Sequence, residues 1–255
     1  MEVSVALTQE LVGGGVRLDG APADEGAGLP VDGDTAVVVL DVVRATTVLC
    51  TALGAGAAGV RPVGGVEEAR AEAAARGALL VGERGGLPPE GFDLGNSPGD
   101  FTAEVCAGRE VVLTTTNGTR AVERCAAAGR VLAASFLNAE ATARALAAGP
   151  QRRVLLLCAG SGGRVAADDV AAAGCLAGHL ALRAAAEPDD GARTAAALFD
   201  AWKHDLRGLL RRSLSGRKLT DVGLATDIDA CVKVDALPLV AERDGEGVFR
   251  RTDPS

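Results

Sequence analysis

Polar side chains interrupt the apolar segment at residues 37–49, VVVLDVVRATTVL, where a strand that only fills a core has no use for them. Four apolar residues lead directly into Asp41, and Arg44 follows three positions later. A carboxylate at a strand end can bind a cation or move a proton, and arginine offers a planar fork for phosphate or carboxylate. Asp41 could also be a helix N-cap, but its position directly after a buried strand favours a functional site.

Two later strands, at residues 111–114 and 154–158, also run into a polar loop and then a helix. The polar residues that follow them are Thr115, Thr116, Asn117 and Ser161. Parallel strands end at one edge of a sheet, where the following helices present free N–H groups, so these loops predict an anion site. The likeness also indicates an internal repeat with units starting near residues 37 and 111; chance similarity is the alternative.

Carboxylates accompany this anion site. Glu83 and Arg84 lie in the loop after another strand, and Asp168 and Asp169 close the third polar loop. Carboxylates repel a phosphate unless a divalent cation lies between them, and oxygen ligands suit Mg²⁺. We therefore expect Mg²⁺ as cofactor, with Asp41, Glu83 and Asp169 as its ligands.

Strands and helices alternate along the chain. Strands are expected over residues 1–7, 36–41, 59–63, 78–82, 110–114, 130–136 and 152–160, with helices between them. Residues 192–214 predict a helical stretch whose Phe199 and Trp202 face either the core or a homodimer partner, and residues 230–245 predict one or two closing strands. The pattern predicts a single α/β domain over residues 1–255, with a mostly parallel or mixed sheet between helix layers.

Composition excludes several classes of protein. The net charge is −8, no basic face is evident and aromatic residues make up 2% of the chain, which argues against nucleic-acid binding. No apolar run reaches membrane-spanning length, and no export signal begins the chain, so we expect a cytoplasmic protein. The six cysteines form no CxxC pair, which argues against zinc-ribbon and thioredoxin-like sites and suits a reducing compartment.

Six segments, in order, resemble the 2-phosphosulfolactate phosphatase family, the Mg²⁺-dependent phosphohydrolases of coenzyme M biosynthesis. These segments are VVVLDVVRATT, GERGGLPPEGFDLGNSP, TTTNGTRA, SFLNA, LCAGSGGR…DD and TDIDACVKVD, and they span residues 37–235. The resemblance implies a three-layer α/β/α fold of two similar, intimately joined subdomains. It also implies hydrolysis of a phosphate monoester of a small 2-hydroxy acid with a second acidic group, such as 2-phospho-3-sulfolactate.

The resemblance also implies roles for individual residues. Asp41, Arg44 and Asn117 are the expected catalytic residues, and Arg84, Thr115, Thr116 and Ser161 are the expected substrate-binding residues. The chain departs from the family pattern near the third loop. Asp169 matches the family's acid, whereas Asp168 is a shortened Glu and Ala172 holds the position of a Cys. A water on the cation is the simplest nucleophile, with Asp41 as the alternative.

Two rival hypotheses remain open from the sequence. CAGSGGR, from Cys158 to Arg164, satisfies the Cys-x5-Arg layout of cysteine-dependent phosphatases. A non-catalytic binder of phosphorylated acids would use the same anion donors, although the carboxylates would then be surplus. Asp227, Asp229 and Asp235 have even odds of reaching the site, and the two histidines are expected to be structural.

Overall fold

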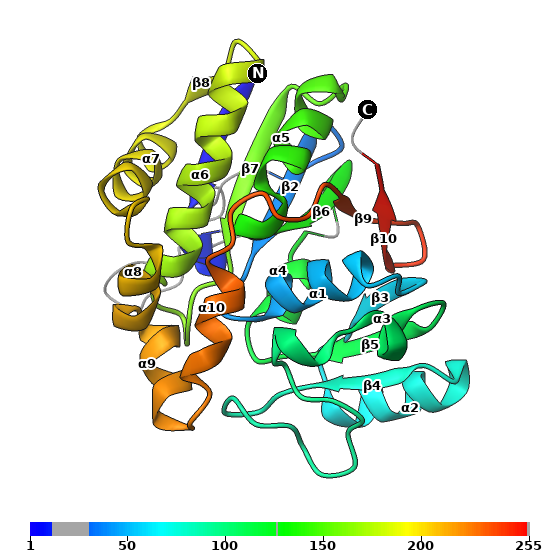
Figure 1. The fold of residues 1–255 in the computed structure, drawn as a ribbon. Helices are drawn as coiled ribbons and strands as arrows, with labels where there is room; N and C mark the ends of the chain where they lie inside the picture. The colour runs from blue at the N-terminus through cyan, green and yellow to red at the C-terminus, as the bar shows by residue number, and fades with distance from the viewer. Residues whose placement is uncertain (12–30, 126, 254–255) are drawn as a thin grey trace.

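Ten strands join in one mixed sheet in the computed structural model, which describes residues 1–11, 31–125 and 127–253 (Figure 1). The strands are β1 (Glu2–Ala6), β2 (Thr35–Leu40), β3 (Gly59–Pro62), β4 (Leu79–Gly82), β5 (Glu110–Thr114), β6 (Arg130–Ala134), β7 (Arg153–Cys158), β8 (Glu187–Pro188), β9 (Val240–Arg243) and β10 (Phe249–Thr252). Their order across the sheet is β4-β5-β3-β10-β9-β6-β2-β7-β1-β8. The mixed α/β sheet predicted from the sequence is confirmed.

The helices lie between and after these strands. They are α1 (Ala45–Gly54), α2 (Val66–Arg76), α3 (Ala103–Cys106), α4 (Gly118–Glu123), α5 (Ala139–Ala148), α6 (Ala167–Arg183), α7 (Asp190–Trp202), α8 (Leu206–Arg212), α9 (Leu214–Asp221) and α10 (Ile228–Cys231), with short 3₁₀ turns at Gln9–Leu11, Pro98–Asp100, Phe136–Asn138 and Ala225–Asp227. None of the described helices has the length and apolar character that crossing a lipid bilayer requires.

The sheet consists of two parallel blocks joined by an antiparallel hairpin. The large block is β6-β2-β7-β1-β8 and the small block is β4-β5-β3, each with parallel pairing throughout. The β9–β10 hairpin pairs antiparallel with β6 on one side and with β3 on the other. The hairpin therefore continues the sheet between two blocks whose strands point in different directions.

The strand order relates the two expected repeat units to one another. In the small block, β5 of the second unit lies between β4 and β3 of the first, and in the large block β2 of the first unit lies between β6 and β7 of the second. Exchanging β2 with β5, β3 with β6 and β4 with β7 reverses the order of these six strands and changes nothing else. Each unit thus completes the other's sheet.

Strand β2 shows why the sheet is covered on both faces. Val38 and Leu40 contribute to a core cluster with α5, α6, α7 and α8, whereas Val37 and Val39 contribute to a second cluster with α1 and α4. Alternate side chains of a strand point to opposite faces, so a continuous apolar run needs helices on both sides. The result is a helix layer on each face of the sheet (Figure 1).

The helical stretch expected over residues 192–214 is instead three helices. Asp189, Asp205 and Ser213 each accept a hydrogen bond from a backbone N–H three residues later, at Ala192, Gly208 and Gly216. Each side chain caps a new helix, so capping interrupts an apolar pattern that runs through all three. The segment over residues 230–245, expected to form one or two strands, also differs. Its first half holds the end of α10 and a turn, and its second half holds β9. Strand β10, which follows this segment, was not predicted.

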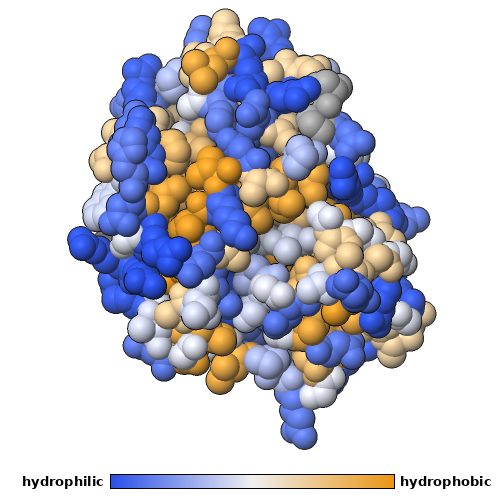
Figure 2. All heavy atoms as spheres, in the orientation of Figure 1, coloured by the Kyte–Doolittle hydropathy of each residue, from blue (hydrophilic) through white to orange (hydrophobic). Residues whose placement is uncertain are grey.

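The Phe199–Trp202 stripe of α7 packs against the large-block core. The Phe199 ring stacks on Phe136 with centroids 6.2 Å apart, and the Arg212 guanidinium lies 5.5 Å from the centre of the Trp202 ring. Figure 2 shows hydrophilic residues over the margins of this face of the molecule and apolar residues gathered near its middle, around α6. Packing within the chain therefore accounts for the stripe without a homodimer.

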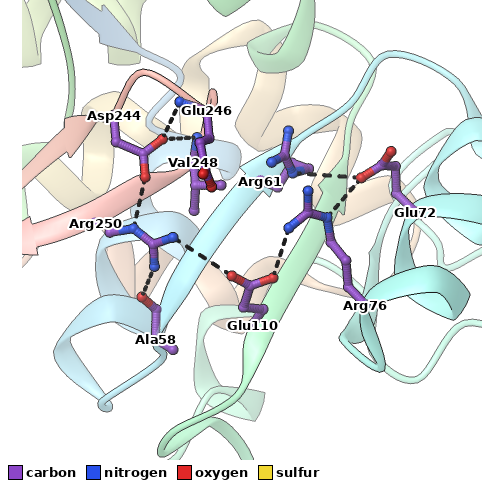
Figure 3. A network of polar contacts seen from close by, with 9 residues as sticks. All are labelled: Ala58, Arg61, Glu72, Arg76, Glu110, Asp244, Glu246, Val248 and Arg250. Carbon is purple, nitrogen blue, oxygen red and sulfur yellow. Dashed lines mark hydrogen bonds and ion pairs between the residues drawn. The ribbon is translucent and has the colours of Figure 1, made fainter.

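A chain of ion pairs fastens α2 to the small block and the hairpin (Figure 3). Arg76 contacts Glu72 at 2.9 Å and Glu110 at 3.3 Å. Arg250 lies 3.8 Å from Glu110 and 2.8 Å from Asp244. Exposed pairs contribute little singly, but these link β5, α2 and β10 at the place where the hairpin meets the small block.

The packing of α7 on α6 provides a test of the fold. A Cβ on Gly174 would lie 2.0 Å from the backbone oxygen of Ala195, whereas a Cβ on Gly178 of the same helix meets nothing within 4 Å. Gly174→Ala should lower the free energy of unfolding by about 1–3 kcal/mol because the two helices must separate. Gly178→Ala, the matched control, should raise it by about 0.5–1 kcal/mol. Urea unfolding of both variants measures this, and equal effects would contradict the packing.

Candidate functional site

The loops after β2, β4, β5 and β7 line a single cavity of about 380 Å³, together with α9. From the strand ends come Asp41, Arg44, Glu83, Thr115, Thr116, Asn117 and Ser161, all of them predicted site residues. Ligands of α/β proteins bind at the carboxyl ends of parallel strands. Here the ends belong to both blocks, so the cavity lies between the large and the small block.

Asp41 is the buried acid of this cavity, with 7% of its surface exposed. Burial, together with the nearby charges of Asp168 and Glu83, raises the pKa of its carboxyl to about 7, while hydrogen bonds from the backbone amides of Ala45 and Gly118 oppose the rise. Asp41 therefore holds a carboxyl that can gain or lose a proton near neutral pH.

Gly118 allows α4 to approach Asp41. A Cβ at this position would lie 2.9 Å from Asp41 Oδ2 and 2.8 Å from the Ala45 side chain. The first residues of α1 and α4 thus meet at the carboxylate, and only a glycine leaves room for the contact. Asn117 and Gly118 form the start of α4 against the acid.

Arg44 is buried and held by three separate segments. Its Nη1 donates to Asp227 Oδ2 at 2.6 Å and to Ser97 Oγ at 3.2 Å, and its Nη2 donates to the Gly86 carbonyl at 2.7 Å. Asp227 compensates its charge within the protein. Of the three acids given even odds, only Asp227 contacts a cavity residue in this way, since Asp229 pairs with Arg207 and Asp235 with His179.

Glu83 and Thr116 are hydrogen-bonded to one another. Glu83 Oε1 accepts from the Thr116 N–H at 2.8 Å and from its hydroxyl at 2.9 Å, and Oε2 accepts from the Gly86 N–H at 2.8 Å. Arg84 does not line the cavity: it donates to the Glu83 and Gly64 carbonyls and to Thr114 Oγ1. The Thr116 hydroxyl and the Arg84 guanidinium donate to protein acceptors in this arrangement. Their substrate-binding roles therefore stay predictions.

Asp169 joins two strand ends rather than facing the cavity. Its Oδ1 accepts from the Val42 N–H at 2.8 Å and its Oδ2 from the Gly160 N–H at 2.9 Å. Asp168 beside it is 1% exposed, and neither of its oxygens has a partner of good geometry in the described part of the chain. Burial raises the pKa of Asp168 to about 6, although the nearby hydroxyls of Ser213 and Ser215 work against that rise.

Other polar residues line the cavity, and two of them have a buried atom without a hydrogen-bond partner among the described residues. Thr115 Oγ1 and Asn96 Oδ1 are buried and unbonded among the described residues. Asn117 Oδ1 accepts from the Gly162 N–H at 3.4 Å, and Ser161 Oγ accepts from Lys218 Nζ at 2.8 Å. Asn96 and Lys218 were not predicted as site residues. Asn96 lies within the GFDLGNSP segment, whereas nothing in the pattern of α9 distinguishes Lys218 from a surface lysine.

The carboxylates suit a hard cation only in part. No group of three or more His, Cys, Asp or Glu side chains in residues 1–11, 31–125 and 127–253 is arranged to hold a metal ion. Mg²⁺ commonly takes one or two carboxylates, keeps several waters and completes its shell with substrate phosphate. Asp41 and the unpartnered Asp168 fit that mode. Glu83 and Asp169 already bind backbone amides, so their assignment as metal ligands stays a prediction.

Cys158 is poorly placed to be a nucleophile. It is fully buried and does not line the cavity, and burial together with Asp169 and Asp168 raises the pKa of its thiol well above the usual value. Attack requires the thiolate, which cysteine-dependent phosphatases obtain by lowering this pKa. Arg164 is exposed on the surface. The structure therefore does not support the cysteine-dependent alternative.

Asp168 predicts how stability depends on pH. Its pKa rises from 3.8 to about 6 on folding, so the folded protein keeps a proton that the unfolded chain releases. The free energy of unfolding should fall by on the order of 2 kcal/mol as pH rises from about 4 to above 6 in EDTA. Asp168→Asn removes this titration and should be more stable than the wild type at pH 8, with the advantage lost near pH 4.

Urea unfolding at several pH values checks the expectation. Asp200→Asn, a change at an exposed acid on α7, is the control and should follow the wild-type profile. An unchanged pH profile in Asp168→Asn would show that Asp168 does not titrate as its burial implies.

Comparison with known proteins agrees with this architecture. The family model described as 2-phosphosulpholactate phosphatase matches residues 29–246. Relatives named "Probable 2-phosphosulfolactate phosphatase" include one from Thermus thermophilus, 41% identical over 84% of this chain and 92% of the relative. The relative from Gloeobacter violaceus is 38% identical over 98% of this chain and 98% of the relative. The relative from Deinococcus radiodurans is 42% identical over 80% of this chain and 85% of the relative. The chain belongs to the 2-phosphosulfolactate phosphatase family, a family of phosphoric monoester hydrolases.

Proposed function

We propose that this protein hydrolyses the phosphate monoester of a small 2-hydroxy acid, converting 2-phospho-3-sulfolactate to 3-sulfolactate and phosphate with the help of Mg²⁺. The observation that carries the proposal is the buried Asp41 beside unbonded polar atoms in a cavity of about 380 Å³. A small organic phosphate fits a cavity of this size, and the names of the relatives support the choice of substrate.

The loop after β5 and the neighbouring loops of the cavity would bind the phosphate. Thr115 Oγ1 is free to donate to a phosphate oxygen, and the Asn117 amide and Ser161 hydroxyl lie beside it in the cavity lining. Arg44 adds a guanidinium whose position is fixed by Asp227, Ser97 and Gly86. These groups would hold the phosphorus atom next to Asp41.

Asp41 would act as the general base and general acid of the reaction. As water attacks phosphorus and the bond from phosphorus to the C2 oxygen breaks, the Asp41 carboxylate would take the proton from water and return it to the leaving alkoxide. Mg²⁺ held by Asp41 and Asp168 would offset the negative charge of the phosphate. The raised pKa values of both acids are what burial imposes without a cation, and a cation would favour their ionised forms.

The cellular setting completes the proposal. The reaction would serve coenzyme M biosynthesis. All six cysteines are free and buried, which suits the reducing cytosol that we infer for this enzyme.

Asp41→Asn tests the role of the acid. The amide cannot take a proton and binds a cation weakly, so the rate of phosphate release should fall by about 10²–10⁴-fold while the fold is preserved. A phosphate-release assay over phosphorylated 2-hydroxy acids, with Mg²⁺ and with EDTA, measures this. Near-wild-type turnover in Asp41→Asn would remove Asp41 from the mechanism, and release that survives EDTA would remove the metal. Binding without release by the wild type would favour the non-catalytic binder.

Gly118→Ala tests the positioning of Asp41. The added methyl must displace either Asp41 or Ala45, and a shift of about 1 Å at a reacting group costs on the order of 100-fold in kcat/KM. Gly99→Ala is the control, because a Cβ there meets nothing within 4 Å. Comparable activity in both variants would show that the close approach of α4 does not position the acid.

A further inference from the structure

Helix α9 contributes a cation to the cavity that the predicted site lacked. Lys218 lines the cavity, and its Nζ reaches Ser161 Oγ at 2.8 Å, joining α9 to the loop after β7. Residues 161 and 218 are brought together only by the fold. The bond uses one of the three N–H donors of the ammonium group, so two remain for a ligand.

Lys218 is the cavity cation whose charge is not compensated by a carboxylate. Arg44, the other cation in the described lining, pairs with Asp227 at 2.6 Å. Within the described residues, no carboxylate lies within ion-pair distance of Lys218 Nζ, although Asp221 lines the same cavity. A positive charge is thus available where a negatively charged ligand group could approach.

Lys218 lies beside the proposed phosphate site. Its partner Ser161 belongs to that site, and the N–H of the adjacent Gly162 donates to Asn117 of the same site at 3.4 Å. A second acid group carried next to the phosphate would therefore approach the ammonium. An ammonium is a compact point charge that accepts a tetrahedral sulfonate from many directions, whereas the planar fork of Arg44 better matches a carboxylate or phosphate.

We infer that Lys218 is a specificity-determining residue that binds the second acid group of the substrate, the sulfonate beyond C2, while Ser161 holds the ammonium in place. The inference rests on the proposed function for the identity of the reaction. Its own content is narrower: discrimination between phosphorylated acids that carry this group and those that lack it depends on Lys218.

Steady-state kinetics of Lys218→Met test the inference. For 2-phospho-3-sulfolactate, KM should rise about 10- to 100-fold, the effect of losing a charged hydrogen bond, while kcat changes only a few-fold. For 2-phospholactate, which lacks the sulfonate, KM should change less than about 2-fold on the same reasoning. Lys218→Arg should keep most of the discrimination, and Lys203→Met, at an exposed lysine after α7, should match the wild type. An equal loss for both substrates would overturn the inference.

Calorimetric binding of 3-sulfolactate separates this inference from the proposed reaction. The wild type should bind 3-sulfolactate more tightly than lactate, and Lys218→Met should lose that preference, whether or not phosphate is released. Retention of the preference by Lys218→Met, or its absence from the wild type, would overturn the role of Lys218. Absence of phosphate release with a Lys218-dependent preference would instead overturn the proposed reaction alone.

Discussion

Two backbone hydrogen bonds to Asp169 hold the site together. They join the chain after β2, at Val42, to the chain after β7, at Gly160. These strands are neighbours in the large block, and their loops carry Asp41 and Ser161 into the same cavity. Because both oxygens of Asp169 are used in this way, the residue positions the loops, and the buried carboxylate without a hydrogen-bond partner is that of Asp168 beside it.

The burial of three acids in so small a volume costs stability. Desolvation raises the pKa of Asp41, Asp168 and Asp169, and repulsion by neighbouring acids adds to the rise for Asp41 and Asp169. Such an arrangement persists only when the surrounding structure is strong enough to hold it. Here the fully buried strands β2 and β7 and the helices on both faces supply that strength, and a bound cation or an anionic ligand with its cation would relieve the repulsion.

The exchange of strands between repeat units explains why the cavity is assembled from distant parts of the chain. β2 and β7 of the large block and β4 and β5 of the small block end around it. Arg44 then links the first unit to the C-terminal segment through Asp227, and Lys218 links α9 to the loop after β7.

The sequence by itself determined most of the strands, the mixed sheet and the cluster at the strand ends, because apolar runs and the polar residues that end them are local features. Asp41, Thr115, Asn117 and Ser161 could be placed in one site on that basis. Only the tertiary structure decided which way each side chain points: Asp168 open and Asp169 occupied, Arg84 directed away, Lys218 directed inward. Adjacent residues on a helix or loop face different neighbours, and several of those neighbours come from distant segments of the chain, as Ser161 does for Lys218, which no local pattern encodes.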